Sequence, residues 1–152
     1  MNFKLDHIGI QTNNFENTVK WYEDFFGCEQ MWYKKKEDLP EAIQRRMPLA
    51  YQLVELQKND LKFHVFDLEN PEYSTQPKNA LCMEHFCVEV DTFEELKELR
   101  EHWISLFESG NYTFQRTSLP TEIIPSSHGM QGFYAHDPNG IELEVFYLPK
   151  QA

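Results

Sequence analysis

The stretch that decides the fold is LDHIGIQTNNFENTVKWYEDFFG, residues 5–27, because the chain carries a second version of it. The second version is MEHFCVEVDTFEELKELREHW, residues 83–103. At a shift of 78 positions His7 meets His85 and Phe15 meets Phe93. Each copy alternates apolar and polar residues over a short strand and then places apolar residues at helical spacing. The chain is therefore predicted to be a duplicated unit in which a strand leads into a helix.

Both helices have recognisable ends. Asn14 fits an N-cap and Gly27 a stop for the first helix, while Thr92 and Glu95 have the spacing of a capping box and Gly110 ends the second. Three strand-like segments are expected after each helix. They are residues 28–34, 51–57 and 61–68 in the first half and 112–119, 132–137 and 141–147 in the second. The predicted fold class is α+β, built from two βαβββ modules.

The chain length and the spacing of prolines predict the domain organisation. A chain of 152 residues is long enough for one domain made of two small modules. The segment ENPEYSTQPKNA, residues 69–80, has no periodicity and reads as a linker. We expect a single domain over residues 1–152, with module one at about 1–70, a linker at 70–81 and module two at 82–149.

The composition excludes several classes of partner. A formal net charge of -11 argues against binding to nucleic acid or to an anionic membrane surface. No apolar run is long enough for a membrane span, and the first residues do not read as a signal peptide. Three cysteines without zinc-type spacing favour reduced thiols, so we expect a cytoplasmic protein.

Four strands place an imidazole or a carboxylate on the face that does not pack against a helix. Alternation puts His7, His64 and His85 opposite the apolar residues of their strands, and Glu144 opposite Leu143 and Val145. Two histidines and one carboxylate form the ligand set of non-haem Fe(II) oxygenases, which zinc, manganese or nickel could also use. Glu142 shares the face of Glu144 but lies nearer the turn, so we expect it to face solvent.

The paired modules, the run LDHIGIQT into ENTVKWYEDFFG, and DPNGIELE at residues 137–144 resemble the vicinal oxygen chelate superfamily. That superfamily includes glyoxalase I, methylmalonyl-CoA epimerase, fosfomycin-resistance proteins, bleomycin-binding proteins and extradiol dioxygenases. The resemblance implies two mixed four-stranded sheets curved into a cup-shaped half-barrel around one metal, with the helices outside. It implies His7, His85 and Glu144 as ligands, His64 as a possible fourth ligand, and a homodimer.

The C-terminal stretch SHGMQGFYAHDPNGIELEVF, residues 127–146, most resembles extradiol dioxygenases. That resemblance implies that Tyr134 and His128 hydrogen-bond the substrate oxygens while His64 moves protons. Phe66, Phe146 and Trp32 would line the substrate pocket. The favoured reading is an Fe(II) dioxygenase that acts on a small catechol-like or other vicinal-oxygen substrate.

Two other readings stay open. In a glyoxalase-like lyase or isomerase, or an epimerase, His64 would be the fourth ligand, and Ni(II) or Co(II) would serve as well as iron. The third hypothesis is a metal-free binding protein of the bleomycin-resistance kind, which would not need the predicted metal ligands.

Overall fold

The computed structural model describes residues 1, 4–68, 83–126 and 129–149. It divides into two compact units, Met1–Asn79 and Ala80–Ala152, each described here by itself. Each unit contains one four-stranded mixed sheet and one long helix, so the predicted α+β class with two βαβββ modules is confirmed. The predicted linker at 70–81 lies outside the described residues.

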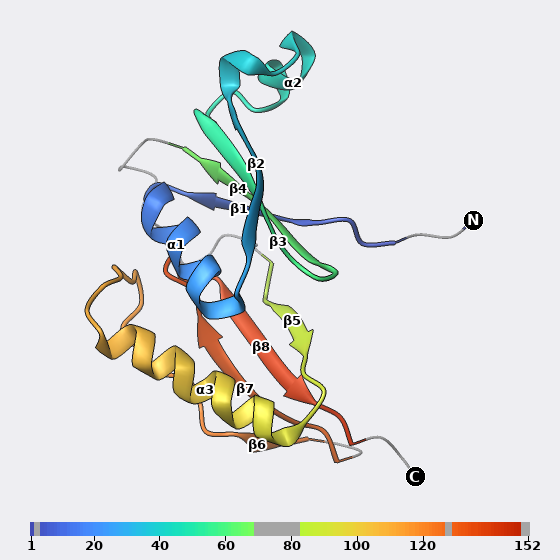
Figure 1. Cartoon of the computed structure of the whole chain (residues 1–152), viewed down its shortest axis with the longest axis vertical. Coiled ribbons are helices and arrows are strands. Elements are labelled where there is room, and N and C mark those ends of the chain that lie inside the picture. Colours follow the sequence, from blue (N-terminus) through green and yellow to red (C-terminus); the bar gives the residue numbers. More distant parts are fainter. Residues whose placement is uncertain (2–3, 69–82, 127–128, 150–152) are drawn as a thin grey trace. The chain divides into compact units, whose positions relative to one another are not determined.

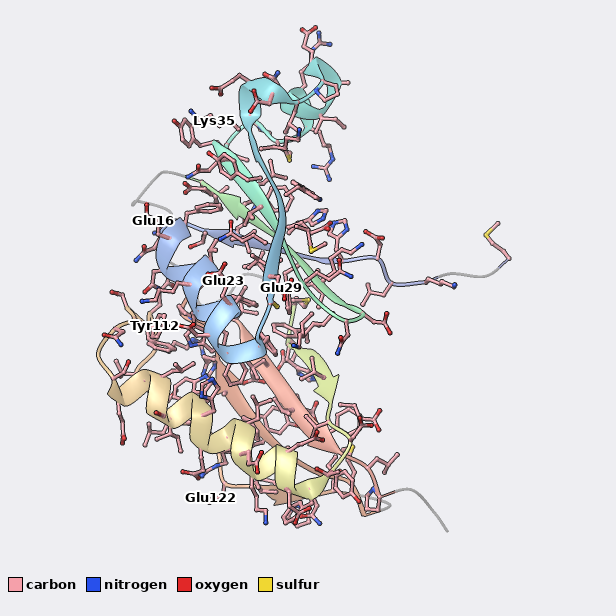
Figure 2. All side chains as sticks on the ribbon, viewed as in Figure 1. Glu16, Glu23, Glu29, Lys35, Tyr112 and Glu122 are labelled. Carbon is pink, nitrogen blue, oxygen red and sulfur yellow. The ribbon has the colours of Figure 1, made fainter. Side chains whose placement is uncertain are left out.

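Unit 1 holds the first sheet (Figure 1). Its elements are β1 (Ile8–Thr12), α1 (Phe15–Phe26), β2 (Glu29–Lys35), the 3-10 helix η1 (Lys36–Asp38), α2 (Glu41–Arg46), β3 (Gln52–Lys58) and β4 (Leu61–Asp67). The strand order is β1-β4-β3-β2, with β1 parallel to β4 and the other pairs antiparallel. β1 and β2 are the edge strands, and the ends of β2 at Glu29 and Lys35 are labelled in Figure 2.

Helix α1 packs on this sheet through aromatic side chains. Trp21 and Tyr22 are completely buried, and the ring of Tyr22 meets Phe63 of β4 edge-on at 4.7 Å. The helix stops at Gly27, whose φ of 68° lies in the left-handed region that glycine adopts at little cost.

Unit 2 repeats the arrangement. It consists of β5 (Phe86–Glu89), α3 (Phe93–Glu108), β6 (Ile124–Pro125), β7 (Gln131–His136) and β8 (Glu142–Tyr147), with strand order β5-β8-β7-β6. Thr92 and Glu95 form the predicted capping box, because each side chain accepts a hydrogen bond from the other's backbone N–H. Trp103 of α3 is completely buried and its indole N–H donates to the His136 carbonyl at 3.0 Å.

One predicted strand is wrong. Residues 112–119 form no strand, and the edge of the second sheet is instead the two-residue strand β6. Phe114, in the middle of this segment, packs against Trp103 and Phe107 of α3. The segment therefore uses its apolar residues to cover the helix rather than to extend the sheet.

The alternation of faces is confirmed in the strands that carry the candidate residues. In β4, Phe63 and Val65 are completely buried while His64 and Phe66 on the other face are partly exposed. In β8, Leu143 and Val145 on one face are completely buried. No helix in the described part of the chain is long and apolar enough to cross a membrane.

Candidate functional site

The clearest pair of candidate groups is His85 with Glu144 in unit 2. His85 directly precedes β5, and Glu144 lies on β8 beside Cys87, its partner across the parallel pair. Their side chains meet, with His85 Nε2 3.1 Å from Glu144 Oε2. Glu144 is only 9% exposed, so its carboxylate has lost most of its water and depends on these neighbours.

Tyr134 holds the other oxygen of the same carboxylate. It lies opposite Glu144 on the antiparallel neighbour β7, and its hydroxyl donates to Glu144 Oε1 at 3.0 Å. Burial raises the pKa of the Tyr134 hydroxyl, and the hydrogen bond to Glu144 adds to the rise. Tyr134 therefore remains a donor, and the two oxygens of Glu144 have different partners.

Cys87 lies on the same face as His85 and Glu144. Desolvation raises the pKa of its thiol to about 12, and the neighbouring Glu144 carboxylate adds to the effect. A thiol with such a pKa stays protonated at neutral pH, so Cys87 offers no thiolate to the site.

Glu142 lies closer to His85 than the sequence suggested. Its Oε1 is 3.9 Å from His85 Nδ1, and its Oε2 is 3.7 Å from Nε2 of His136. The side chain of Glu142 is 33% exposed, so it is neither fully solvated nor buried. Although Glu142 lies next to the turn, its side chain is still near His85, because β8 begins at Glu142 and runs parallel to β5.

His136 is a neighbour of the site that the sequence analysis missed. It shares a face of β7 with Tyr134, and its Nε2 lies 3.2 Å from the Arg116 guanidinium. Burial lowers the pKa of His136, and the positive charge of Arg116 lowers it further. Strand alternation from Tyr134 was the signal that could have found it.

The candidate groups of unit 1 are His7 and His64, whose rings stack with centroids 3.7 Å apart. Nδ1 of His7 lies 2.8 Å from Oδ2 of Asp6, and Lys62 Nζ is 3.4 Å from the other Asp6 oxygen. The hydrogen bond to His7 lowers the pKa of Asp6, and Lys62 lowers it further. Asp6 therefore remains an acceptor, and the His7 nitrogen facing it carries a proton.

His64 is held from the opposite nitrogen. Its Nε2 lies 2.8 Å from Glu55 Oε2 on β3, and the two side chains are only 15% and 13% exposed. Two of the predicted pocket residues surround it, with the Trp32 ring edge-on at 5.0 Å and the Phe66 ring at 6.4 Å. An apolar wall around a paired polar group is the usual composition of a small-molecule site.

Glu55 was missed, although a sequence signal for it exists. It interrupts the apolar strand YQLVELQ as Glu144 interrupts IELEVFY. An acid in such a strand needs a polar partner on its own face.

Phe146 and His128 complete the predicted set. Phe146 lies on β8 opposite Gly132 of β7, where a Cβ would come within 3.2 Å of the Phe146 Cβ and 2.9 Å of the Val145 carbonyl oxygen. The missing side chain of Gly132 thus makes room for Phe146. His128 lies outside the described residues.

The side chains described above provide some, but not all, of the ligands that a metal ion needs. Among the residues with described positions, no three His, Cys, Asp or Glu side chains form a group that could hold a metal. The pair His85 and Glu144 does fit two neighbouring ligands, since ligand atoms at right angles about 2.1 Å from an octahedral metal are about 3 Å apart. His7 of unit 1 has a carboxylate on Nδ1 and offers Nε2 as a further donor.

Comparison with known proteins agrees with the fold. The model of the Glyoxalase/Bleomycin resistance protein/Dioxygenase superfamily matches residues 4–145. A glyoxylase/bleomycin resistance protein/dioxygenase domain from Frankia sp. EAN1pec has a TM-score of 0.70 at 12% identity, covering 98% of this chain and 100% of its own. No curated protein matches the chain.

Two further solved structures carry names that specify a reaction or a resistance. Lactoylglutathione lyase from Agrobacterium tumefaciens has a TM-score of 0.60 at 19% identity and covers 97% of this chain and 95% of its own. The fosfomycin resistance protein FosX from Listeria monocytogenes, in complex with Mn(II) and sulfate, has a TM-score of 0.61 at 13% identity, covering 98% and 95%. At these identities the likeness shows a shared fold alone.

Proposed function

We propose that this chain, which belongs to the Glyoxalase/Bleomycin resistance protein/Dioxygenase superfamily, is a metal-dependent enzyme acting on a small molecule with two neighbouring oxygens. His7, His85 and Glu144 are the proposed ligands of a divalent metal. The observation that carries the proposal is the 3.1 Å approach of His85 Nε2 to Glu144 Oε2. Two acceptor atoms so close together repel each other unless a proton or a cation lies between them.

The environment of His7 supports the same assignment. Its Nδ1 lies 2.8 Å from the Asp6 carboxylate, whereas Glu142 lies 3.9 Å from Nδ1 of His85, beyond hydrogen-bond distance. A metal-binding histidine commonly has such a carboxylate behind it, which fixes the tautomer and leaves Nε2 as the donor. Tyr134 adds a third support by holding Oε1 of Glu144, which leaves Oε2 free for a cation.

His64 is the proposed acid–base group rather than a ligand. Its Nε2 faces Glu55, which is not a proposed ligand, whereas Nε2 of His85 faces the proposed ligand Glu144. A bound metal would supply Lewis acidity that lowers the pKa of a coordinated hydroxyl. His64 would accept the proton that such a hydroxyl loses, and the rings of Trp32, Phe66 and Phe146 would exclude water from the substrate.

The reaction that this arrangement favours is extradiol-type oxygen chemistry on a catechol-like substrate, with Fe(II) as the metal. Three protein ligands leave room for a bidentate substrate and O₂ together. The second candidate is a lyase or isomerase of the glyoxalase kind, with Mn(II), Ni(II), Co(II) or Zn(II), in which His64 would be the fourth ligand beside His7, on whose ring it stacks at 3.7 Å. We propose a cytoplasmic homodimer with no nucleic-acid or membrane partner.

One experiment separates these reactions. Protein purified anaerobically is loaded with Fe(II) or Mn(II), and O₂ uptake is measured against a panel of catechols. The same samples are tested for loss of the hemithioacetal of methylglyoxal and glutathione. O₂ uptake that depends on both Fe(II) and a catechol supports the dioxygenase. Hemithioacetal turnover without O₂ uptake would replace it with the lyase, and failure to bind either metal would leave a non-catalytic binding protein.

A further inference from the structure

Glu55 and Tyr134 occupy equivalent positions in the two modules. Glu55 is the cross-strand partner of His64 in the β3–β4 pair, as Tyr134 is of Glu144 in the β7–β8 pair. The residues paired across the parallel strands also occupy equivalent positions in the two modules. His64 pairs with Gly9, which lies two residues after His7, and Glu144 pairs with Cys87, two residues after His85. The duplication therefore places a His, a candidate site group and a cross-strand partner at matching positions in each sheet.

The cross-strand partner makes the same kind of contact in both units. Tyr134 donates to Oε1 of Glu144 at 3.0 Å, which leaves Oε2 toward His85. Glu55 Oε2 lies 2.8 Å from Nε2 of His64, and within the described residues no carboxylate pairs with its Nδ1. In unit 1, Nε2 of His64 binds Glu55 on the neighbouring strand and Nδ1 stays available. In unit 2, Oε1 of Glu144 binds Tyr134 on the neighbouring strand and Oε2 stays available.

The chemistry of a carboxylate settles the direction of the bond in unit 1. A carboxylate only accepts hydrogen bonds, so the His64 nitrogen that faces Glu55 carries the proton. The stacked His7 ring and the edge of Trp32 restrict rotation of the His64 ring. The carboxylate of Glu55 is largely buried, and an unpaired carboxylate there would be costly.

We propose that Glu55 is a positioning residue for His64. It holds the proton on Nε2 and so presents the lone pair of Nδ1 as the proton acceptor of the site. A buried carboxylate orients a catalytic histidine in this way: it fixes the tautomer and the orientation of the ring and does not contact the substrate. The inference rests on the proposed function, in which His64 moves a proton.

The test uses the full chain without metal and reads the ring nitrogens of His64 by ¹⁵N-resolved NMR. In the wild type, Nε2 is expected to carry a proton with a downfield ¹H resonance, and Nδ1 to be unprotonated. Glu55→Met should abolish that resonance. Glu55→Gln should keep it at a less downfield position, because a neutral acceptor makes a weaker bond than a carboxylate. Gln57→Met, on the same face of β3, should change nothing.

Two further readouts separate this inference from the proposed function. Mn(II) binding should be unchanged in both Glu55 variants, whereas kcat of Glu55→Met on the substrate identified should fall about 10²-fold at constant KM, the cost of a misplaced catalytic group. A wild-type His64 with its proton on Nδ1, or a resonance indifferent to Glu55→Gln, would overturn the inference. A wild type that binds neither Fe(II) nor Mn(II) would overturn the proposed function and leave the NMR result standing.

Discussion

His7 and His64 each have a carboxylate beside one ring nitrogen, and that neighbour decides which nitrogen is left for other contacts. For His7 the neighbour is Asp6, the preceding residue, at 2.8 Å. For His64 it is Glu55 on the next strand, at 2.8 Å from the other nitrogen. The histidines were visible in the sequence, but the nitrogen that each offers depends on contacts that only the folded sheet shows.

Asp6 should matter for metal binding through His7. Asp6→Asn is expected to weaken Mn(II) affinity about 10–100-fold, because carboxylates behind metal-binding histidines contribute on that scale. Isothermal titration calorimetry measures the effect. The matched control is Glu84→Gln, since Glu84 precedes His85 as Asp6 precedes His7, while the described structure pairs His85 with Glu142 and Glu144 instead. Equal affinities for the two variants would contradict a supporting role for Asp6.

His136 should make the fold sensitive to acid. Its pKa is lowered by burial and by Arg116, so the unfolded chain binds the proton more readily than the folded chain. This penalty is absent well above pH 6.5 and grows as the pH falls below that value, the ordinary pKa of the group. Urea unfolding at pH 7.5 and 5.5 should therefore show a smaller acid loss of stability in His136→Gln than in wild type.

The control for that measurement is His102→Gln, since His102 is an exposed residue of α3. It should leave the acid loss of stability as it is in the wild type. An identical pH dependence for the His136 variant and the wild type would show that His136 takes no part.

The turn between β3 and β4 sets which residue faces His64. Asn59 lies at φ 51°, and the pair Lys58 and Leu61 closes the two-residue turn. With that closing pair fixed, the antiparallel register places Glu55 opposite His64. The sequence marks a turn here by Asn-Asp between two strand patterns, since both residues are common in turns, but it does not specify the register.

Asn59 can be tested by substitution. Asn59→Val should lower the free energy of unfolding by about 1–2 kcal/mol, because a branched side chain opposes the left-handed conformation. Asn59→Gly should leave stability nearly unchanged. Denaturant unfolding followed by circular dichroism measures both variants. A valine variant as stable as the glycine variant would contradict the positive φ.

Helices and buried strands were predictable because each has a strong periodic pattern, as the stripe of α1 and the alternation of β4 and β8 show. The short edge strand β6 of the second sheet was not predictable from the sequence. β6 contributes only Ile124 and Pro125, too short for any alternation, and Phe114 of the predicted strand packs against α3 instead.

For the chain taken whole, the duplication is the strongest inference the sequence allowed, and the matching strand orders of the two sheets agree with it. The repeat predicted equivalent roles for His7 and His85. It could not predict Glu55, Tyr134 and Glu142 as partners, because a partner is defined by strand pairing and by the reach of a side chain across it. The proposed metal site draws on both units, so a measurement on the intact protein must test it.

The measurement that tests the proposed metal site most directly is Mn(II) binding by the Glu144→Gln variant. Electron paramagnetic resonance of free Mn(II) should show one ion bound per wild-type chain, and Glu144→Gln should lose most of it while its circular dichroism is unchanged, because the variant lacks the ligand charge. Glu89→Gln, which removes the same charge from the neighbouring strand β5, should bind as the wild type does. Full Mn(II) occupancy in a folded Glu144→Gln protein would contradict the assignment of His7, His85 and Glu144 as the metal ligands.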